Sequence, residues 1–92
     1  DNNVQKIDIE DIYYVEAYGN FVKIHLSDKY FLTAETLAHI QKNVPAFLQV
    51  HRSYIVNLDF VEKISGNRLV LKNKTEIPIG NSYKQAVLGK WK

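Results

Sequence analysis

The sequence predicts a mainly β domain, in which short antiparallel strands form compact sheets or a meander and one or two small helices complete the fold. Apolar and polar residues alternate over several short stretches, which is typical of half-buried strands. These stretches are separated by dipeptides that suit tight turns, such as Gly19-Asn20 and Gly66-Asn67. The strands are too numerous and too short for a doubly wound parallel sheet.

Three strands are expected in the first third of the chain. Residues 12–18 are a dense run of β-branched and aromatic side chains, which predicts a strand covered on both faces. Residues 22–27 alternate between apolar and polar side chains, and residues 30–33 form a shorter strand. Gly19-Asn20 joins the first two strands, because a glycine at the first central position suits a tight hairpin turn.

The second half of the chain repeats this pattern. Strands are expected at residues 60–64, 68–71 and 75–79, and they are separated by Gly66-Asn67 and Asn73-Lys74. Both separators contain residues that tolerate a positive φ angle, so each predicts a turn between antiparallel neighbours.

Two segments depart from the strand pattern and predict helices. In residues 35–43 the apolar side chains recur at helical spacing, with Thr33 as the expected cap and Pro45 as the stop. A second short helix is expected to begin near Asn81-Ser82, where aromatic and apolar residues recur every fourth position.

Composition limits the possible functions without choosing one. The 92 residues suffice for a single domain, residues 1–92, and the lack of methionine predicts a piece cut from a longer protein. The lack of cysteine excludes disulfides and thiolate metal sites and fits a reducing cytoplasm. There is no apolar run of membrane-spanning length and no signal-peptide pattern. A net charge of +2 is compatible with a polyanionic partner but does not require one.

Four segments, in order and spacing, resemble a known family. They are residues 12–22 (IYYVEAYGNFV), 36–37 (TL), 47–57 (FLQVHRSYIVN) and 77–84 (IPIGNSYK). The most specific part runs from His51 to Asn57. The four together resemble the LytTR family of DNA-binding domains over nearly the whole chain.

The resemblance implies a compact all-β domain that binds imperfect direct repeats in promoter DNA. Two such domains would occupy the repeats, either in tandem or as a dimer. It implies a role in transcription regulation, as the output domain that follows a receiver domain, in the C-terminal part of a bacterial two-component response regulator. It further implies a cytoplasmic protein that needs no cofactor or metal, makes no membrane contact through this domain and catalyses no reaction. Members of this family reach the DNA grooves from loops and strand ends, and no helix in this sequence carries a basic, base-reading face.

Carried over by position, the resemblance predicts that base edges are contacted by Asn20, Arg52 and Asn81. Asparagine can pair with adenine and arginine with guanine in the major groove. Contacts to the DNA backbone, which fix register without reading sequence, are expected at five further positions. These are Phe21, Lys23, Ser53, Tyr83 and Lys84.

Each base-reading residue also has a structural interpretation. Asn20 lies where turn chemistry alone favours asparagine, and Arg52 follows a strand, where a solvated charge is the usual outcome. Asn81 or Ser82 can serve as the N-cap of the final helix. His51 is expected to play a structural role in holding its segment.

One position departs from the family pattern. The family often has arginine where this chain has Asn81, so the guanidinium that would reach a guanine is missing here. We therefore expect altered or weaker specificity at one end of each DNA repeat.

Three rival functions remain open at this stage. An enzyme is disfavoured, because the histidines lack metal-ligand spacing and no serine lies in a glycine-flanked elbow. A small β-barrel that binds single-stranded nucleic acid requires exposed aromatic side chains on strands, for which Tyr18 and Phe21 are the candidates. A protein-interaction module would use an edge strand or Trp91. Other aromatic residues lie in apolar runs and are expected in the core: Tyr14, Phe31, Phe47 and Tyr54.

Overall fold

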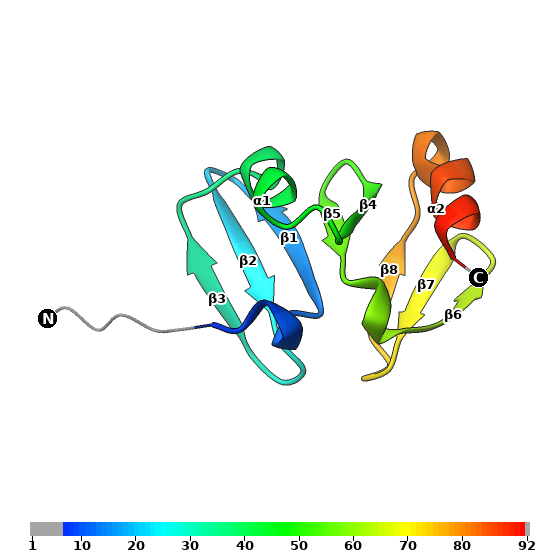
Figure 1. The fold of residues 1–92 in the computed structure, drawn as a ribbon, viewed down its shortest axis with the longest axis horizontal. Helices are drawn as coiled ribbons and strands as arrows, with labels where there is room; N and C mark the ends of the chain where they lie inside the picture. The colour runs from blue at the N-terminus through cyan, green and yellow to red at the C-terminus, as the bar shows by residue number, and fades with distance from the viewer. Residues whose placement is uncertain (1–6, 92) are drawn as a thin grey trace, which may run out of the picture.

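The structure, a computed structural model, describes residues 7–91 and has two antiparallel sheets (Figure 1). The five-stranded sheet has the order β3-β2-β1-β5-β4, and the three-stranded sheet has the order β6-β7-β8. The strands are β1 (Tyr14–Tyr18), β2 (Phe21–His25), β3 (Tyr30–Thr33), β4 (Leu48–His51), β5 (Tyr54–Val56), β6 (Val61–Ser65), β7 (Arg68–Leu71) and β8 (Glu76–Pro78). The helices are α1 (Leu37–Asn43) and α2 (Lys84–Lys90), with 3-10 turns η1 (Ile9–Asp11), η2 (Leu58–Phe60) and η3 (Asn81–Tyr83). The predicted fold class is confirmed.

Two hydrophobic clusters hold the domain together. The first lies between the two sheets and α2, and its buried members are Tyr14, Val50, Val56, Val61, Leu69, Leu71, Ile77, Ile79 and Val87. The second lies between the five-stranded sheet and α1, and its buried members are Ile12, Val15, Val22, Phe47 and Ile55. Successive strand residues point to opposite faces, so Tyr14 and Val15 serve different clusters. The prediction of a strand covered on both faces is therefore confirmed at the start of β1 only.

The aromatic residues expected in the core divide into two groups. Tyr14 and Phe47 are buried, and Tyr54 packs half-buried against the first cluster. Phe31 is half-buried and belongs to neither cluster. Trp91 also packs against the first cluster, so it is not the free anchor that a protein-interaction module would need.

The cap of the first helix differs from the one expected. Thr36 is the N-cap of α1, and its hydroxyl accepts a hydrogen bond from the backbone N–H of His39 at 3.1 Å. The prediction that Thr33 caps this helix is wrong. Thr33 is the last residue of β3, where it pairs with Val22, and it lies too early in the chain to reach the first turn of α1.

Asn57 joins the two sheets, between the end of β5 and η2. It is buried, and its side-chain amide donates to the carbonyl of Ile12 at 3.0 Å and accepts from the N–H of Asp59 at 3.0 Å. Its backbone N–H donates to the carbonyl of Tyr13 at 3.0 Å. The connection between the sheets is thus fixed by hydrogen bonds at a buried site, where each is costly to break.

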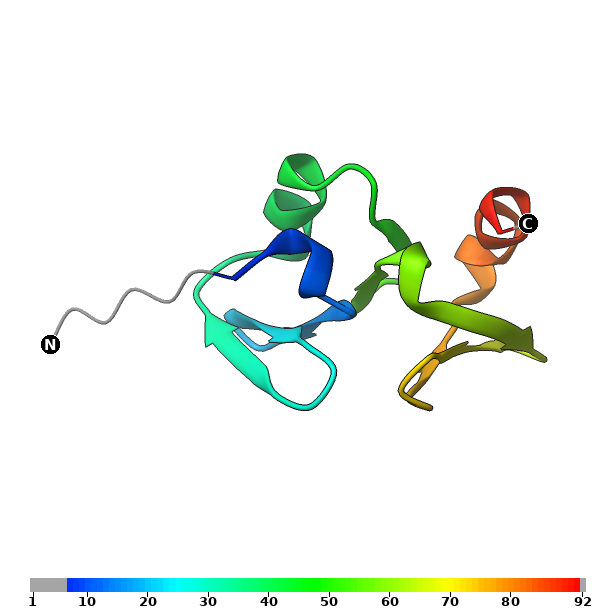
Figure 2. The same cartoon turned by 60° about the horizontal axis from the view of Figure 1, so that its bottom comes forward.

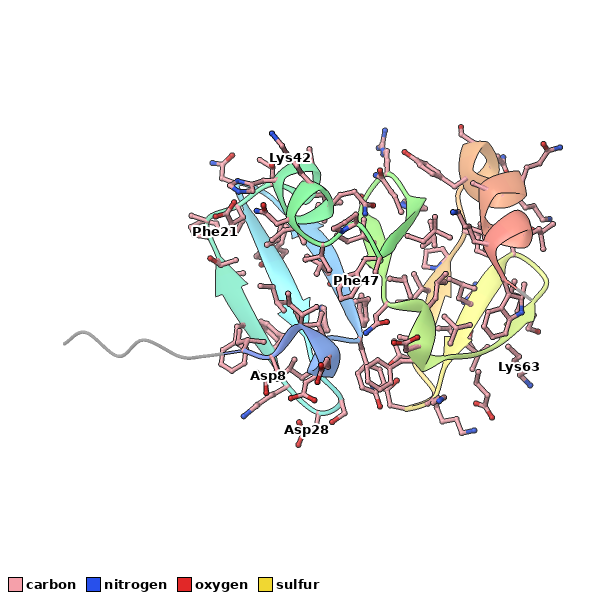
Figure 3. All side chains as sticks on the ribbon, in the orientation of Figure 1. Asp8, Phe21, Asp28, Lys42, Phe47 and Lys63 are labelled. Atoms are coloured by element: carbon pink, nitrogen blue, oxygen red, sulfur yellow. The ribbon has the colours of Figure 1, made fainter. Side chains whose placement is uncertain are left out.

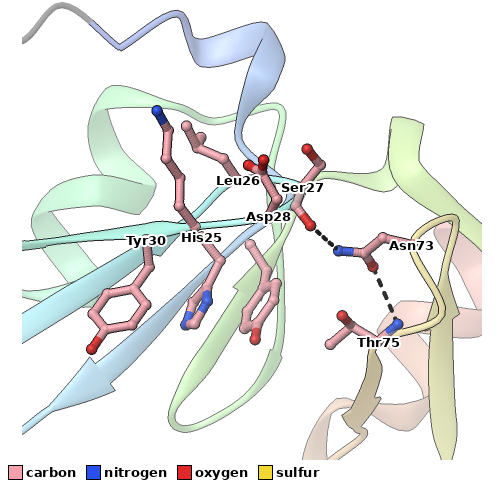
Figure 4. Close-up of a pocket in the computed structure, with 9 residues that line it drawn as sticks. His25, Leu26, Ser27, Asp28, Tyr30, Asn73 and Thr75 are labelled. Atoms are coloured by element: carbon pink, nitrogen blue, oxygen red, sulfur yellow. Dashed lines mark hydrogen bonds between the residues drawn. The ribbon is translucent and has the colours of Figure 1, made fainter.

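A second link between the sheets lies near their lower edge in Figure 1. The side chain of Asn73, in the β7–β8 turn, donates to the carbonyl of Ser27 at 3.0 Å and accepts from the N–H of Thr75 at 3.2 Å (Figure 4). These residues border a hollow of about 270 Å³ that is open to solvent. Its lining is mostly polar and is already engaged in this bridge.

A polar cluster lies where β1, β2 and β5 meet. The imidazole Nε2 of His25 lies 3.0 Å from the carboxylate of Glu16, which also accepts from the Tyr54 hydroxyl at 3.5 Å. The His25 ring stacks on Tyr14 with the centroids 4.1 Å apart. Burial raises the pKa of Tyr14 to about 12, and burial lowers the pKa of His25 although Glu16 opposes that effect.

The lowered pKa of His25 predicts acid-sensitive stability. As the pH is lowered through 6.5, the ordinary pKa of histidine, His25 is protonated in the unfolded chain but stays neutral in the folded domain. The free energy of unfolding should therefore decrease as the pH is lowered. Urea unfolding at several values between about pH 7.5 and 5 measures this slope. The control is His25→Phe, which keeps a stacked ring but cannot titrate, and its slope should be flatter. Equal slopes for the two proteins would contradict the prediction.

None of the helices within residues 7–91 is long and apolar enough to cross a membrane. The same residues contain no group of three or more His, Cys, Asp or Glu side chains placed to hold a metal ion.

Candidate nucleic-acid interface

Three connections lie side by side along one edge of the domain, the upper edge in Figure 1. They are the β1–β2 turn, the β4–β5 turn and residues 79–83 between β8 and α2. The N–H of Ala17 in β1 donates to the carbonyl of Ser53 at 2.8 Å, which joins the first two connections. The N–H of Gly80 donates to the carbonyl of Val50 in β4 at 2.8 Å, which joins the third. We call these three connections the upper edge.

Asn20 is exposed in the β1–β2 turn, and the turn does not require it. Gly19 adopts a φ of 60°, whereas Asn20 is not among the residues with a positive φ. A turn in which only the first central residue is left-handed is of type II′ and depends on its glycine. The left-handed position of this turn is therefore taken by glycine, and the side chain of Asn20 is exposed at the edge.

Arg52 is exposed at the tip of the β4–β5 turn. The backbone of this turn is fixed by its neighbour, because Nδ1 of His51 accepts a hydrogen bond from the N–H of Ser53 at 3.1 Å. The structural role expected for His51 is confirmed. Arg52 and Asn20 border the same hollow, of about 290 Å³, so the structure brings these two predicted base readers together.

Asn81 is exposed at the start of η3, immediately after Gly80. A Cβ at Gly80 would lie 3.0 Å from Cδ2 of Tyr83 and 3.6 Å from Cα of His51, so glycine allows this segment to pack tightly on β4. The residue at the N-cap of α2 is Tyr83, and it makes no side-chain cap. The alternative interpretation of Asn81 or Ser82 as that cap is therefore wrong.

The three predicted base readers share one further property. Within residues 7–91, no hydrogen bond or ion pair engages the side chain of Asn20, Arg52 or Asn81. Exposed polar side chains without a partner in their own domain keep their full capacity to bind an external ligand.

Four of the five predicted backbone-contacting residues lie at or beside this edge. Phe21 directly follows the first turn and is exposed, and Ser53 shares the second turn with Arg52. Tyr83 is half-buried against the first cluster. Lys84 begins α2, and its Nζ donates to the side-chain carbonyl of Asn67 at 2.7 Å. Each of the three predicted base readers thus has at least one of these residues next to it or close to it in the same connection.

Lys23 is the exception. Its ammonium lies on the outer face of the five-stranded sheet, 4.1 Å from the ring centroid of Tyr18 and 4.9 Å from that of Tyr30. The structure therefore places Lys23 on the same sheet face as Phe21, away from Asn20, Arg52 and Asn81 on the upper edge.

Charge is distributed unevenly between the two edges. The lower edge, formed by η1, the β2–β3 loop and η2, carries a group of carboxylates: Asp8, Glu10, Asp11, Asp28 and Asp59. Figure 3 shows Asp8 and Asp28 on this side and Lys42, which is exposed on α1, on the opposite side. Sequence reasoning missed Lys42, although the placement of acids in alternate connections could have indicated which edge faces a polyanion.

Comparisons with known proteins agree with this geometry. The family model described as "LytTr DNA-binding domain" matches residues 2–92. The sensory transduction protein LytT of Bacillus subtilis is 30% identical over 84 residues, which are 84% of this chain and 35% of that protein. The LytT protein of Bacillus cereus is 28% identical over 90 residues, 90% of this chain and 37% of that protein. The chain thus spans about a third of the length of these relatives.

A solved LytTr DNA-binding domain from Bacillus cereus has the same fold. It superposes with a TM-score of 0.82 at 20% sequence identity, covering 90% of this chain and 83% of that chain. At this identity the likeness concerns the fold alone.

Proposed function

The chain belongs to the LytTR family of DNA-binding domains, and on that basis we propose that it binds double-stranded DNA sequence-specifically through the upper edge and so regulates transcription. The observation that carries this proposal is the alignment of three exposed and unengaged polar side chains, Asn20, Arg52 and Asn81, on one edge. Five carboxylates gather on the lower edge, whereas the acid that borders the hollow of Asn20 and Arg52 is Glu35, which is paired with His39 at 2.8 Å. This distribution of charge favours the upper edge as the side that meets a polyanion.

The chemistry of the three side chains suits base edges. The guanidinium of Arg52 can donate twice to O6 and N7 of guanine, and the amides of Asn20 and Asn81 can pair with N6 and N7 of adenine. Each such bidentate contact is worth roughly 1–3 kcal/mol of discrimination. We propose that Phe21, Ser53, Tyr83 and Lys84 contact the flanking backbone, where backbone N–H, hydroxyl and ammonium groups fix the register.

The finer features follow from the family resemblance. We propose that the target is an imperfect direct repeat in promoter DNA and that two domains occupy it in tandem or as a dimer. We further propose that the domain is the output part of a two-component response regulator with a receiver domain. The domain would act by binding alone, without a catalytic step.

Selection from a randomised duplex library at near-physiological salt tests this function. The domain should enrich a short motif, and its affinity for that motif should fall steeply as salt rises, because neutralised phosphates release counterions. A flat salt response, or a failure to enrich any motif, would refute sequence-specific duplex binding.

Restoring arginine at position 81 should increase affinity. Asn81→Arg supplies a guanidinium that can reach a guanine, so we expect binding to a duplex with guanine at that end of the repeat to tighten roughly 5-fold to 100-fold. Asn81→Gln is the matched control, because it lengthens the side chain without adding charge. Identical motifs and equal affinities for the arginine variant and the unmodified domain would show that residue 81 reads no base.

A further inference from the structure

The outer face of the five-stranded sheet carries an unusual set of exposed side chains. Alternate residues of β1, β2 and β3 point away from the second cluster, and Figure 2 shows α1 and η1 on the opposite face. Within residues 7–91, no helix or strand covers the outer face of β2 and β3. The exposed residues of this face are Tyr18, Phe21, Tyr30 and Leu32, and half-buried Lys23 lies among them. We call these five residues the outer face.

Large apolar side chains are concentrated there. Tyr18 is 53% exposed, Phe21 43%, Tyr30 52% and Leu32 50%. Among residues 7–91 only Ile9 and Leu88 are other large apolar side chains with comparable exposure. A contiguous exposed patch of this kind indicates a binding surface rather than incidental exposure.

Two tyrosine rings of this face lie beside one cation. Tyr18 pairs directly with Phe21 across the β1–β2 hairpin, and Leu32 pairs with Lys23 across the next ladder. The ammonium of Lys23 is held over the rings of Tyr18 and Tyr30 at 4.1 and 4.9 Å. The acidic residue of the same face, Glu16, is already engaged by His25 and Tyr54.

We infer that the outer face is a second nucleic-acid site, which binds a single strand by stacking its bases on Tyr18, Phe21 and Tyr30. Unpaired bases present flat π faces that match exposed aromatic rings on a sheet, and such stacking tolerates any sequence. Lys23 lies among the rings, where its charge can neutralise a phosphate of the same strand. A duplex cannot use this surface, since its bases are stacked on one another.

The outer face adjoins the proposed duplex site and shares Phe21 with it, but the remaining side chains of the two surfaces differ in chemistry. Tyr18 and Phe21 flank the turn that carries Asn20, so a strand on the outer face would begin beside the upper edge. The upper edge offers polar side chains for base edges, whereas the outer face offers rings for base faces. The inference rests on the structure of this face and remains testable if the duplex proposal fails.

The test is fluorescence anisotropy with a labelled oligothymidylate of about 12 nucleotides, within the site sizes of known single-strand grooves. At low salt the domain should bind it with a Kd below about 100 μM, the weak limit of non-specific nucleic-acid binding. Tyr18→Ala and Tyr30→Ala should each weaken binding roughly 5-fold to 100-fold. Tyr18→Phe, which keeps the ring, should bind normally.

Two controls separate this site from its alternatives. Leu88→Ala removes an equally exposed apolar side chain on α2 and should leave oligothymidylate binding unchanged. Arg52→Ala should also leave it unchanged while impairing duplex recognition. The inference is overturned if the unmodified domain fails to bind, if the tyrosine variants bind as well as it does, or if Arg52→Ala loses as much. It is equally overturned if the tyrosine variants change only the oligomeric mass, because the face would then be a protein contact.

Discussion

Arg52→Ala is expected to abolish recovery of a motif from a randomised duplex library. Affinity for the sequence selected by the unmodified domain should fall roughly 5-fold to 150-fold, which corresponds to the loss of one bidentate base contact. The domain should remain folded, because the side chain is exposed and no hydrogen bond or ion pair within residues 7–91 engages it. Selection and a direct affinity measurement on the same duplex both check this result.

Two further variants make the Arg52 result specific. Arg52→Lys keeps the charge but loses the planar pair of donors, so it should retain non-specific binding and lose discrimination at one position. Lys63→Ala removes one positive charge from β6, away from the upper edge (Figure 3), and should keep the motif. If Lys63→Ala lowers motif affinity as much as Arg52→Ala, the effect is general electrostatics and Arg52 is not a base reader.

Local patterns in the sequence were sufficient to predict most of the fold. Alternation of apolar and polar residues located β2, because Val22 and Ile24 pack in the second cluster and the residues between and after them do not. Turn residues on either side located β3, β6 and β7, which are short runs rich in strand-forming residues. The β4–β5 hairpin was not predicted from the sequence. Ile55 and Val56 are adjacent and both buried, since they serve opposite clusters, and so the strand shows no alternation.

The residues of the candidate site could be predicted from the sequence, but their arrangement in space could not. The family resemblance selected Asn20, Arg52 and Asn81, and only the hydrogen bonds made by Gly80 and Ala17 reveal that their segments are neighbours. Lys23 is predicted as a backbone contact by the family resemblance, yet it does not lie on the edge with Asn20. Strand geometry separates them, since alternate residues of β2 point to opposite faces and Lys23 shares the outer face with Tyr18.

Asn57→Ala is expected to lower the free energy of unfolding by about 2–4 kcal/mol. The substitution leaves the buried carbonyl of Ile12 without its partner, which costs about 1–3 kcal/mol, and it also removes the part-buried hydrogen bond from the N–H of Asp59, worth about 1 kcal/mol. The midpoint of thermal unfolding should fall by roughly 10 °C or more in a domain of this size. Denaturant and thermal unfolding followed by circular dichroism measure both quantities.

The same substitution should affect DNA binding through the relation between the two sheets. Asn20 projects from the five-stranded sheet and Asn81 follows the three-stranded sheet, so their relative positions depend on the connection that Asn57 fixes. At a temperature where the variant remains folded, motif affinity should still fall. Asn43→Ala is the matched control, because Asn43 is exposed at the end of α1 and its loss should change stability by no more than about 0.5 kcal/mol. If Asn57→Ala unfolds like this control, the hydrogen bonds at Asn57 do not hold the sheets together.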